Sequence, residues 1–300
     1  MIFETHAHFD DHAFDDDRET LLKKLPEQLI ERAVNVGSSI KTSEESIALS
    51  HAYSYIYAAV GVHPEELQDF SIPGEMVVET NEDDRSIEVW HPKDVPPEFS
   101  EDEDALWRKD PAIRRLYELS KEEKVVSIGE IGLDYYWIKD EKARAWQRYF
   151  FKAQLVLARE RQLPVIVHSR DAAADTMEIM RLASTWGIRA VIHCYSYSLE
   201  QAREYCQLGY YIGIGGVVTF KNSKKLKEVV KEIPLDCILV ETDCPYMAPA
   251  PFRGMRNDSS YLPYVIREIS KLREITEHKV MEQTRENAYT FYGIKSGRKR

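Results

Sequence analysis

Short apolar runs alternate with longer segments of helical periodicity along almost the whole chain, and this alternation limits the possible fold more than any other feature. The longer segments, such as residues 143–162 and 171–186, carry apolar residues at three- and four-residue steps, as amphipathic helices do. Such alternation is typical of a parallel sheet whose strands are joined by helices. Eight strand candidates begin near Ile2, Ala33, Ile56, Val125, Pro164, Ala190, Tyr210 and Cys237.

Eight strands with intervening helices favour an α/β fold of the (β/α)8 type, and 300 residues suffice for one such domain. An open doubly wound sheet would show the same alternation. That fold usually places a glycine-rich phosphate-binding loop after its first strand, and this chain has none there. We therefore expect a single-domain TIM barrel over residues 1–295, followed by a short basic tail over residues 296–300.

The segment 71–110 interrupts this pattern directly after the third strand candidate. It carries the acidic clusters NEDD and EDED, several prolines and no sustained apolar period. These features predict an inserted acidic loop. Because the carboxyl ends of barrel strands carry the functional site, the loop is expected beside that site, either as a lid or wall or as an excursion without a role.

Nearly every strand candidate ends in a histidine or an acidic residue, which an apolar strand would not otherwise tolerate. The carboxyl ends of all strands meet at one rim of a barrel, so these residues are expected to converge in a single pocket. They are His6 and His8 on the first strand, His63 on the third, Glu130 on the fourth, His168 on the fifth, His193 on the sixth and Asp243 on the eighth.

This set of side chains predicts a centre for divalent metal ions. His6 and His8 are two residues apart on a strand, so both imidazoles point to the same side and can reach one cation. A buried carboxylate such as Glu130 is costly unless a cation compensates it, which favours a ligand that bridges two metals. Neutral imidazoles and carboxylates suit Zn, Mn or Mg and do not select among them. Two such ions would activate water for phosphodiester hydrolysis, with Asp243 orienting that water.

Composition limits the partners and the compartment. The formal net charge of −11 disfavours binding of nucleic acid through a broad basic surface, so any such contact must be local. The four scattered cysteines contain no Cys-Xaa-Xaa-Cys pair, and the N-terminal stretch lacks the features of a signal peptide. No apolar run reaches the length of a membrane span. We expect a monomeric cytoplasmic protein without membrane contact.

The chain resembles the TatD family of metal-dependent deoxyribonucleases in the amidohydrolase superfamily. The resemblance covers nearly the whole chain apart from residues 71–110. It is carried, in order, by the motifs ETHAH, GVHP, GEIGLDYY, PVIVHSRDA, HCYS, GGVVTFKN, VETDCPY and RGMRN. It implies a (β/α)8 barrel with two divalent metal ions that hydrolyses DNA, in the family often as an exonuclease.

The resemblance also implies roles for individual residues. One metal would be held by His6, His8, Glu130 and Asp243, and the other by Glu130, His168 and His193. The catalytic residues would be Asp243, Glu130 and His63, with His63 against the scissile phosphate. Further substrate contacts are expected from Lys221, Asn222 and Arg253, and support of the ligands from Glu4, Asp134, Asp171 and Glu241, while Tyr135 and Arg170 are further candidates for support. The family's first motif usually opens with Asp, whereas this chain has Glu4.

Two alternatives remain open at this stage. The same site could cleave an ester such as that of a D-aminoacyl-tRNA, because this barrel serves several hydrolytic reactions. The protein could also bind metals without catalysing a reaction, although a purely structural site is usually closed by its ligands.

Overall fold

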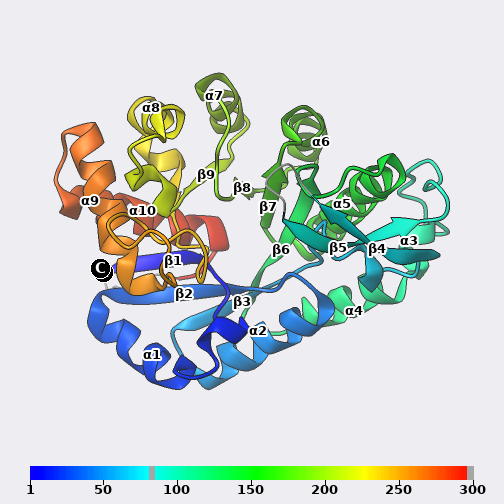
Figure 1. The fold of residues 1–300 in the computed structure, drawn as a ribbon, viewed down its shortest axis with the longest axis horizontal. Coiled ribbons are helices and arrows are strands. Elements are labelled where there is room, and N and C mark those ends of the chain that lie inside the picture. The colour runs from blue at the N-terminus through cyan, green and yellow to red at the C-terminus, as the bar shows by residue number, and fades with distance from the viewer. Residues whose placement is uncertain (81–84, 296–300) are drawn as a thin grey trace.

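The computed structural model describes residues 1–80 and 85–295, and its central element is a sheet of eight parallel strands that curves into a nearly closed barrel (Figure 1). The strands follow one another around the barrel in chain order. Each of the eight strand candidates coincides with one of them, which confirms the predicted (β/α)8 fold as a single domain. The strands are β1 (Ile2–Ala7), β2 (Ile30–Val36), β3 (Ile56–Val60), β6 (Val125–Asp134), β7 (Val165–Arg170), β8 (Ala190–Ile192), β9 (Tyr211–Ile214) and β10 (Ile238–Val240).

Helices join successive strands and cover the outside of the barrel, as Figure 1 shows. The two helical segments expected from the sequence are α5 and α6, with ends within two residues of the expected ones. The helices are α1 (Arg18–Lys24), α2 (Ile40–Ala52), α3 (Leu106–Lys109), α4 (Pro111–Leu119), α5 (Glu141–Arg161), α6 (Ala173–Thr185), α7 (Leu199–Gln207), α8 (Lys224–Glu232), α9 (Leu262–Arg273) and α10 (Glu277–Tyr292). Short 3-10 helices are η1 (His12–Phe14), η2 (Leu25–Gln28), η3 (Leu67–Asp69), η4 (Gly216–Thr219), η5 (Leu235–Cys237) and η6 (Ser259–Tyr261).

Two apolar clusters form on the two faces of the sheet because neighbouring strand residues point to opposite faces. In β7, Val165 and Val167 belong to the larger cluster, which extends into the surrounding helices, whereas Ile166 belongs to the smaller one. The smaller cluster gathers buried residues of seven strands and is completed by the C-terminal helix α10. There the rings of Phe3 and Tyr292 stack with centroids 5.7 Å apart.

The barrel closes between its first and last strands through residues that follow the strand ends. The Asp243 amide donates to the carbonyl of His6 over 2.9 Å, and the His8 amide donates to the carbonyl of Cys244 over 2.9 Å. Ala7 and Cys244 form a parallel bridge. Two segments that carry predicted ligands therefore also form the seam of the barrel.

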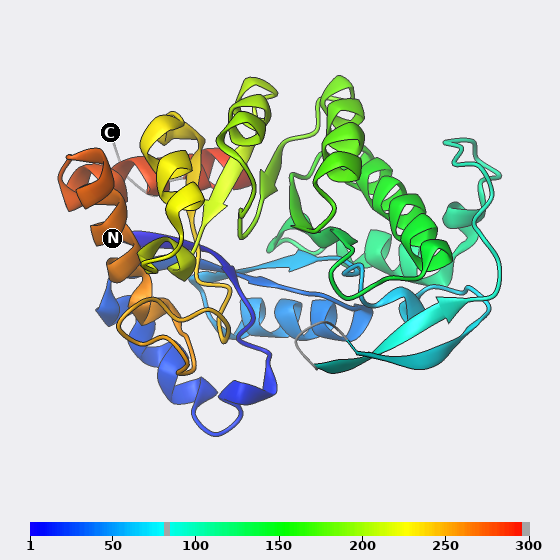
Figure 2. The same ribbon diagram turned by 45° about the horizontal axis from the view of Figure 1, so that its top comes forward.

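The inserted segment is more ordered than the sequence predicted. It lies after β3, as expected, but the expectation of a loop is wrong for much of it, because β4 (Gly74–Thr80) and β5 (Ser86–Pro92) form an antiparallel hairpin. The hairpin lies outside the barrel and packs against α5 (Figure 2). Its anchor is Val89, which is buried in the main core, and Gly74 leaves space for the Trp90 ring. The NEDD cluster at 81–84 and the basic tail at 296–300 lie outside the described residues.

Two buried glutamines of α5 fix the chain that leaves β3. Gln154 accepts a hydrogen bond from the Val62 amide over 2.9 Å and donates one to the Val62 carbonyl over 3.0 Å. Gln147 donates to the carbonyls of Pro64 and Asp134. These bonds hold the segments after β3 and β6 next to each other at the rim.

We predict that Gln154→Leu lowers the free energy of unfolding by about 2 to 5 kcal/mol, because two buried backbone groups of Val62 lose their partners. Urea denaturation would measure the change. Gln207→Leu makes the same substitution at an exposed position of α7 and should change stability by less than about 0.5 kcal/mol. Equal effects of the two substitutions would contradict the role assigned to Gln154.

Candidate metal centre

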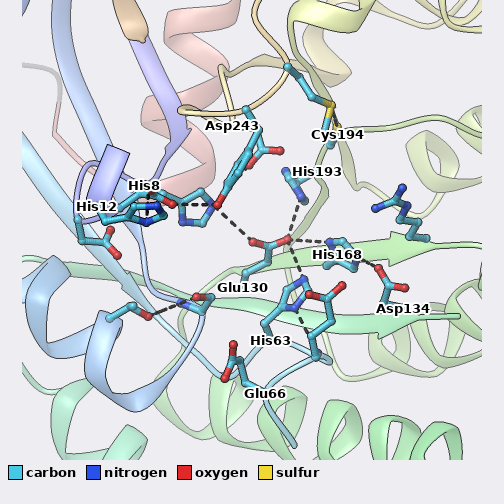
Figure 3. Close-up of a pocket in the computed structure, with 18 of the residues that line it drawn as sticks. His8, His12, His63, Glu66, Glu130, Asp134, His168, His193, Cys194 and Asp243 are labelled. Atoms are coloured by element: carbon cyan, nitrogen blue, oxygen red, sulfur yellow. Dashed lines mark hydrogen bonds and ion pairs between the residues drawn. The ribbon is translucent and has the colours of Figure 1, made fainter. Parts of the chain in front are cut away.

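The polar strand ends converge at the rim formed by the carboxyl ends of the strands. They line a cavity of about 1620 Å³ that opens to solvent, and Figure 3 shows their side chains pointing toward one another across it. The structure thus brings together, from six strands, the residues His6, His8, His63, Glu130, His168, His193 and Asp243.

Glu130 lies at the centre of this cluster, and its two carboxylate oxygens face different neighbours. Its Oε1 lies 2.9 Å from Nδ1 of His168 and 2.9 Å from Nε2 of His193. Its Oε2 lies 3.4 Å from Nε2 of His6 and 3.7 Å from Nε2 of His8. The carboxylate therefore stands between two groups of nitrogen donors.

Asp243 completes the group on the Oε2 side. Its Oδ1 lies 3.7 Å from Nε2 of His6 and 3.4 Å from Nε2 of His8. The two Nε2 atoms are 3.0 Å apart. Nδ1 of His8 is 2.8 Å from the carbonyl of Val36, which can only accept, so Nδ1 donates to it and Nε2 is the nitrogen that faces the centre.

A carboxylate lies on the far side of both His168 and His193, and it forms a hydrogen bond with the ring only at His168. Nε2 of His168 donates to Asp134 over 3.0 Å, and Asp134 is fully buried. Nδ1 of His193 lies 3.5 Å from Glu241, which accepts the Cys194 amide proton over 2.5 Å. Such outer carboxylates typically fix the orientation of metal-binding imidazoles.

Glycines make room for two of these contacts. A Cβ atom on Gly213 of β9 would lie 2.5 Å from a carboxylate oxygen of Glu241. Gly132 of β6 has a φ of 145° and would place a Cβ atom 2.0 Å from the carbonyl of His168. At Gly132 both the backbone conformation and the His168 carbonyl require glycine, whereas at Gly213 a Cβ atom would displace the Glu241 carboxylate.

Glu4 lies beneath the cluster and does not contact an imidazole. Its carboxylate accepts from the amides of His6 and Thr242 and from the Thr242 hydroxyl, over 3.2, 2.9 and 2.7 Å. Burial raises the pKa of Glu4 to about 7. The longer side chain of Glu, relative to the usual Asp, thus bridges β1 and the segment after β10.

Three imidazoles of the cluster have raised pKa values. Although burial opposes its protonation, Glu130 and Glu241 hold the pKa of His193 well above its usual value, and His8 and His168 are shifted in the same direction. Burial opposes their protonation, but the carboxylates of Asp243 and Glu130 outweigh it and raise the pKa of His8 to about 9. In the same way, burial is outweighed by Asp134 and Glu130, which raise the pKa of His168 to about 9. A proton and a metal ion therefore compete for these rings.

The pKa values of His63 and Glu130 are both lowered, which leaves the imidazole neutral and the carboxylate ionised. Burial and the charge of His168 lower the pKa of His63 to about 3, so its ring is neutral at physiological pH. For Glu130, burial would raise the pKa, but the imidazoles of His193 and His63 hold it well below the usual value. The centre therefore combines ionised carboxylates with imidazoles, a donor set that suits divalent cations.

The described residues contain three groups whose ligand atoms lie close enough to hold a metal ion. These groups differ from the predicted sets in two respects. His63 joins Glu130 and His168, and His193 joins His6 and Glu241. The groups are His6, His8 and Asp243; His63, Glu130 and His168; and His6, His193 and Glu241.

Four predicted residues are not brought to this cluster. Lys221 and Asn222 are exposed and do not line the cavity, because the turn after η4 carries them away from it. Arg253 is also exposed and lies over the Phe220 ring, 4.7 Å from its centroid. Asp171 is exposed at a φ of 53° after β7, and the supporting position beside His168 is filled by Asp134.

Other residues of the cavity were not recognised in the sequence. Glu65 lies two residues after His63 in GVHPEE, and burial together with Asp134 raises the pKa of Glu65 to about 7. Trp137 also lines the cavity, and so does Arg170, which the sequence placed among supporting residues only. The sequence could have indicated all three, because each lies within or next to one of the motifs GVHP, GLDYY and HSRD.

The sequence model described as TatD related DNase matches residues 3–293. The chain belongs to the TatD family. The uncharacterized metal-dependent hydrolase YabD of Bacillus subtilis is 38% identical over 294 residues, which are 98% of this chain and 100% of YabD. The crystal structure of YjjV, a TatD homolog of Escherichia coli, has a TM-score of 0.79 and 26% identity over 98% of both chains. A hydrolase of the TatD family from Entamoeba histolytica shares the fold, with a TM-score of 0.74 at 18% identity over 97% of both chains.

Together with the candidate metal-binding clusters, membership in the TatD family shows a metal-dependent hydrolase. Within the described part of the chain, no helix has the length and apolar character needed to cross a membrane.

We predict that metal binding releases protons and strengthens as the pH rises toward about 9, because the pKa values of about 9 mean that metal must displace protons from His8 and His168. Activity should fall in acid, and excess metal should partly restore it. Calorimetric titration with Mn²⁺ in buffers of different ionisation enthalpy would count the protons. Acid inactivation that is indifferent to metal concentration would contradict this explanation.

Proposed function

We propose that this TatD-family hydrolase binds two divalent metal ions and cleaves phosphodiester bonds of DNA, and that it contacts DNA only within its cavity and not through a broad basic surface. The observation that carries the proposal is the position of Glu130, whose two oxygens face separate groups of donors. One metal would be held by His6, His8, Glu130 and Asp243, and the other by Glu130, His168 and His193. When bound, such a pair of ions polarises the phosphoryl group and lowers the pKa of the attacking water.

The residues of the chain supply the rest of the reaction. Asp243 is ionised because, although burial would raise its pKa, the hydrogen bond to His8 and the charges of neighbouring imidazoles lower it. Its carboxylate can orient the attacking water and accept a proton from it. His63 is neutral and lies 3.7 Å from Glu130, so it can donate a hydrogen bond to a phosphoryl oxygen without repelling the metals.

DNA is supported as substrate by the family description, TatD related DNase, and by the fit of a two-metal centre to phosphodiester chemistry. With a net charge of −11, the chain does not attract DNA at long range. Binding should therefore depend on divalent ions and on short-range contacts. Cleavage as an exonuclease and a monomeric cytoplasmic enzyme belong to the same proposal.

One observation favours a second candidate, the cleavage of an aminoacyl ester such as that of a D-aminoacyl-tRNA. Several carboxylates line the mouth of the cavity, including Asp10, Asp11, Asp15 and Glu45. They would attract the ammonium group of an aminoacyl ester, which DNA lacks. Assays on single-stranded DNA and on D-aminoacyl-tRNA, with Mg²⁺ or Mn²⁺, separate the two candidates.

We predict that Glu130→Gln and Asp243→Asn each lower kcat/KM on single-stranded DNA by at least about 100-fold, because the bridging ligand or the proton acceptor is lost. Asp16→Asn removes the same charge at an exposed position and should keep wild-type activity. Metal analysis of each variant would relate activity to occupancy. DNA cleavage at equal rates by wild type and both site variants would identify a contaminating nuclease and refute the proposal.

We predict that His63→Ala keeps the metal content of the wild type while kcat/KM on DNA falls by about 100-fold, because the proposed role of His63 is toward the phosphate. The proximity of His63 to Glu130 and His168 makes the alternative, a metal ligand, directly testable. Elemental analysis after exhaustive dialysis measures the stoichiometry. Loss of one metal per chain would assign His63 to the ligands, and His12→Ala, at an exposed position of the cavity rim, is the matched control.

A further inference from the structure

Two side chains of the cavity, Trp137 and Arg170, have no part in the proposed reaction. Both line the cavity, and they come from neighbouring strand ends, because Asp134 at the end of β6 pairs in register with Arg170 at the end of β7. Arg170 is two residues after His168 on β7, so both side chains lie on the same side of the strand. The pair is therefore adjacent to the metal centre.

The aromatic and guanidinium groups form a stacked arrangement. The Arg170 guanidinium lies 3.8 Å from the centroid of the Tyr136 ring and 5.8 Å from that of Trp137. The two aromatic rings meet edge to face with centroids 4.9 Å apart. We call Tyr136, Trp137 and Arg170 the aromatic platform.

The aromatic platform is fixed to the metal centre by a single buried carboxylate. Asp134 accepts the Trp137 amide proton with Oδ1 over 2.8 Å and the His168 Nε2 proton with Oδ2 over 3.0 Å. One side chain thus determines both the orientation of a candidate ligand and the position of the Trp137 backbone. A ligand held on Trp137 would be placed at a constant position relative to the centre.

The residue before the platform is also fastened. The Tyr135 hydroxyl donates to Asp175 over 2.6 Å and accepts from Arg148 over 2.7 Å, and the Tyr135 amide donates to the Arg170 carbonyl over 2.8 Å. Arg148 and Asp175 are themselves paired at 3.0 Å. The loop after β6 is therefore held in one conformation before any ligand arrives, which lowers the entropy cost of binding.

The charges on the cavity wall favour Arg170 as the cation that meets a phosphate. Arg18 bonds Asp15 over 2.6 Å, and Lys41 lies 3.8 Å from Glu45. Among the described carboxylates, none lies within ion-pair distance of Arg170, and its side chain is exposed. A guanidinium on an aromatic face keeps its hydrogen-bond donors for a second partner.

We infer that the aromatic platform is a nucleotide subsite, in which Trp137 stacks on one unpaired base and Arg170 binds an adjoining phosphate. The choice of a nucleic acid strand as ligand rests on the proposed function. Stacking on aromatic rings tolerates any base, whereas it requires that the base be unpaired and accessible. The subsite therefore selects single strands or frayed ends over intact duplex.

Binding of a thymidine trinucleotide with phosphorothioate linkages, which resist hydrolysis, tests the subsite in the presence of Mg²⁺. Calorimetry would compare the intact trinucleotide with versions that carry one abasic residue at each position. In the wild type, one abasic position should lower the affinity by about tenfold or more. Trp137→Ala should lower the affinity for the intact trinucleotide by a similar factor, and the abasic residue should then cost nothing further.

A matched control and a second variant sharpen the test. Trp186→Ala removes another tryptophan that is paired with an arginine, Arg159, whose guanidinium lies 5.0 Å from the ring centroid, and neither residue lines the cavity. In this variant, the abasic residue should lower the affinity by the same factor as in the wild type. Arg170→Gln should weaken binding of every trinucleotide. It should also reduce the slope of log affinity against log salt concentration by about one, the value for one lost phosphate contact.

Three results would overturn the subsite. The first is that the wild type does not bind the trinucleotide, and the second is that Trp137→Ala binds it with unchanged affinity. The third is that the losses of binding free energy from Trp137→Ala and from the abasic residue are additive. Hydrolysis of unmodified DNA, assayed separately, distinguishes the subsite from the proposed function. Hydrolysis without this coupling would refute the subsite alone, and coupling without hydrolysis would refute the reaction alone.

Discussion

The buried carboxylate of Glu130 is the group on which the arrangement of the site depends. It is 4% exposed and lies in a strand whose residues are all buried, so its charge is costly unless cations or protonated neighbours compensate it. No single element can supply that compensation from both sides of one carboxylate. Donors come instead from strands on either side of β6, His6 from one direction and His168 from the other. A barrel achieves this because its strand ends surround a common axis, whereas an open sheet would present them along a line.

The same residues make the barrel and the site interdependent. The seam between β1 and β10 is formed by backbone bonds of His6 and Asp243, two residues that also face the centre. Glu4 and Thr242 add side-chain bonds across that seam. Burial raises the pKa of Glu4 to about 7, so the charge of this carboxylate beneath the seam changes near physiological pH. Its hydrogen-bond donors come from both sides of the seam, from His6 and from Thr242. A shift of β1 relative to β10 would therefore move two candidate ligands at once.

The fold and the converging residues could be predicted because each leaves a local mark in the sequence. A polar residue at the end of an apolar run is visible without knowledge of its partners, and parallel strands bring such ends together. The hairpin was missed because most residues of its strands are exposed or half-buried and only Val89 and Pro92 are buried, so no long apolar run marks them. Lys221 and Arg253 were placed at the substrate by resemblance, but neither residue lines the cavity. No local sequence pattern shows in which direction the turns that carry them run. Whether a loop residue faces a cavity depends on the path of the loop, which is set by tertiary packing.

Charge around the cavity limits how a polyanion can approach. Acidic residues such as Asp10 and Asp11 line one part of the wall, while Arg170 and Trp137 line the part next to β6 and β7. Repulsion from the carboxylates acts over about 8 to 10 Å at physiological salt, whereas stacking and guanidinium–phosphate contacts act only on close approach. A nucleic acid strand that reached the centre would therefore be oriented by repulsion from the acidic part of the wall and by these short-range contacts, and not by long-range attraction. Under the proposed function, the low affinity expected from the net charge of −11 is compatible with a defined register, because the metal centre and the aromatic platform would hold two points of the same nucleic acid strand.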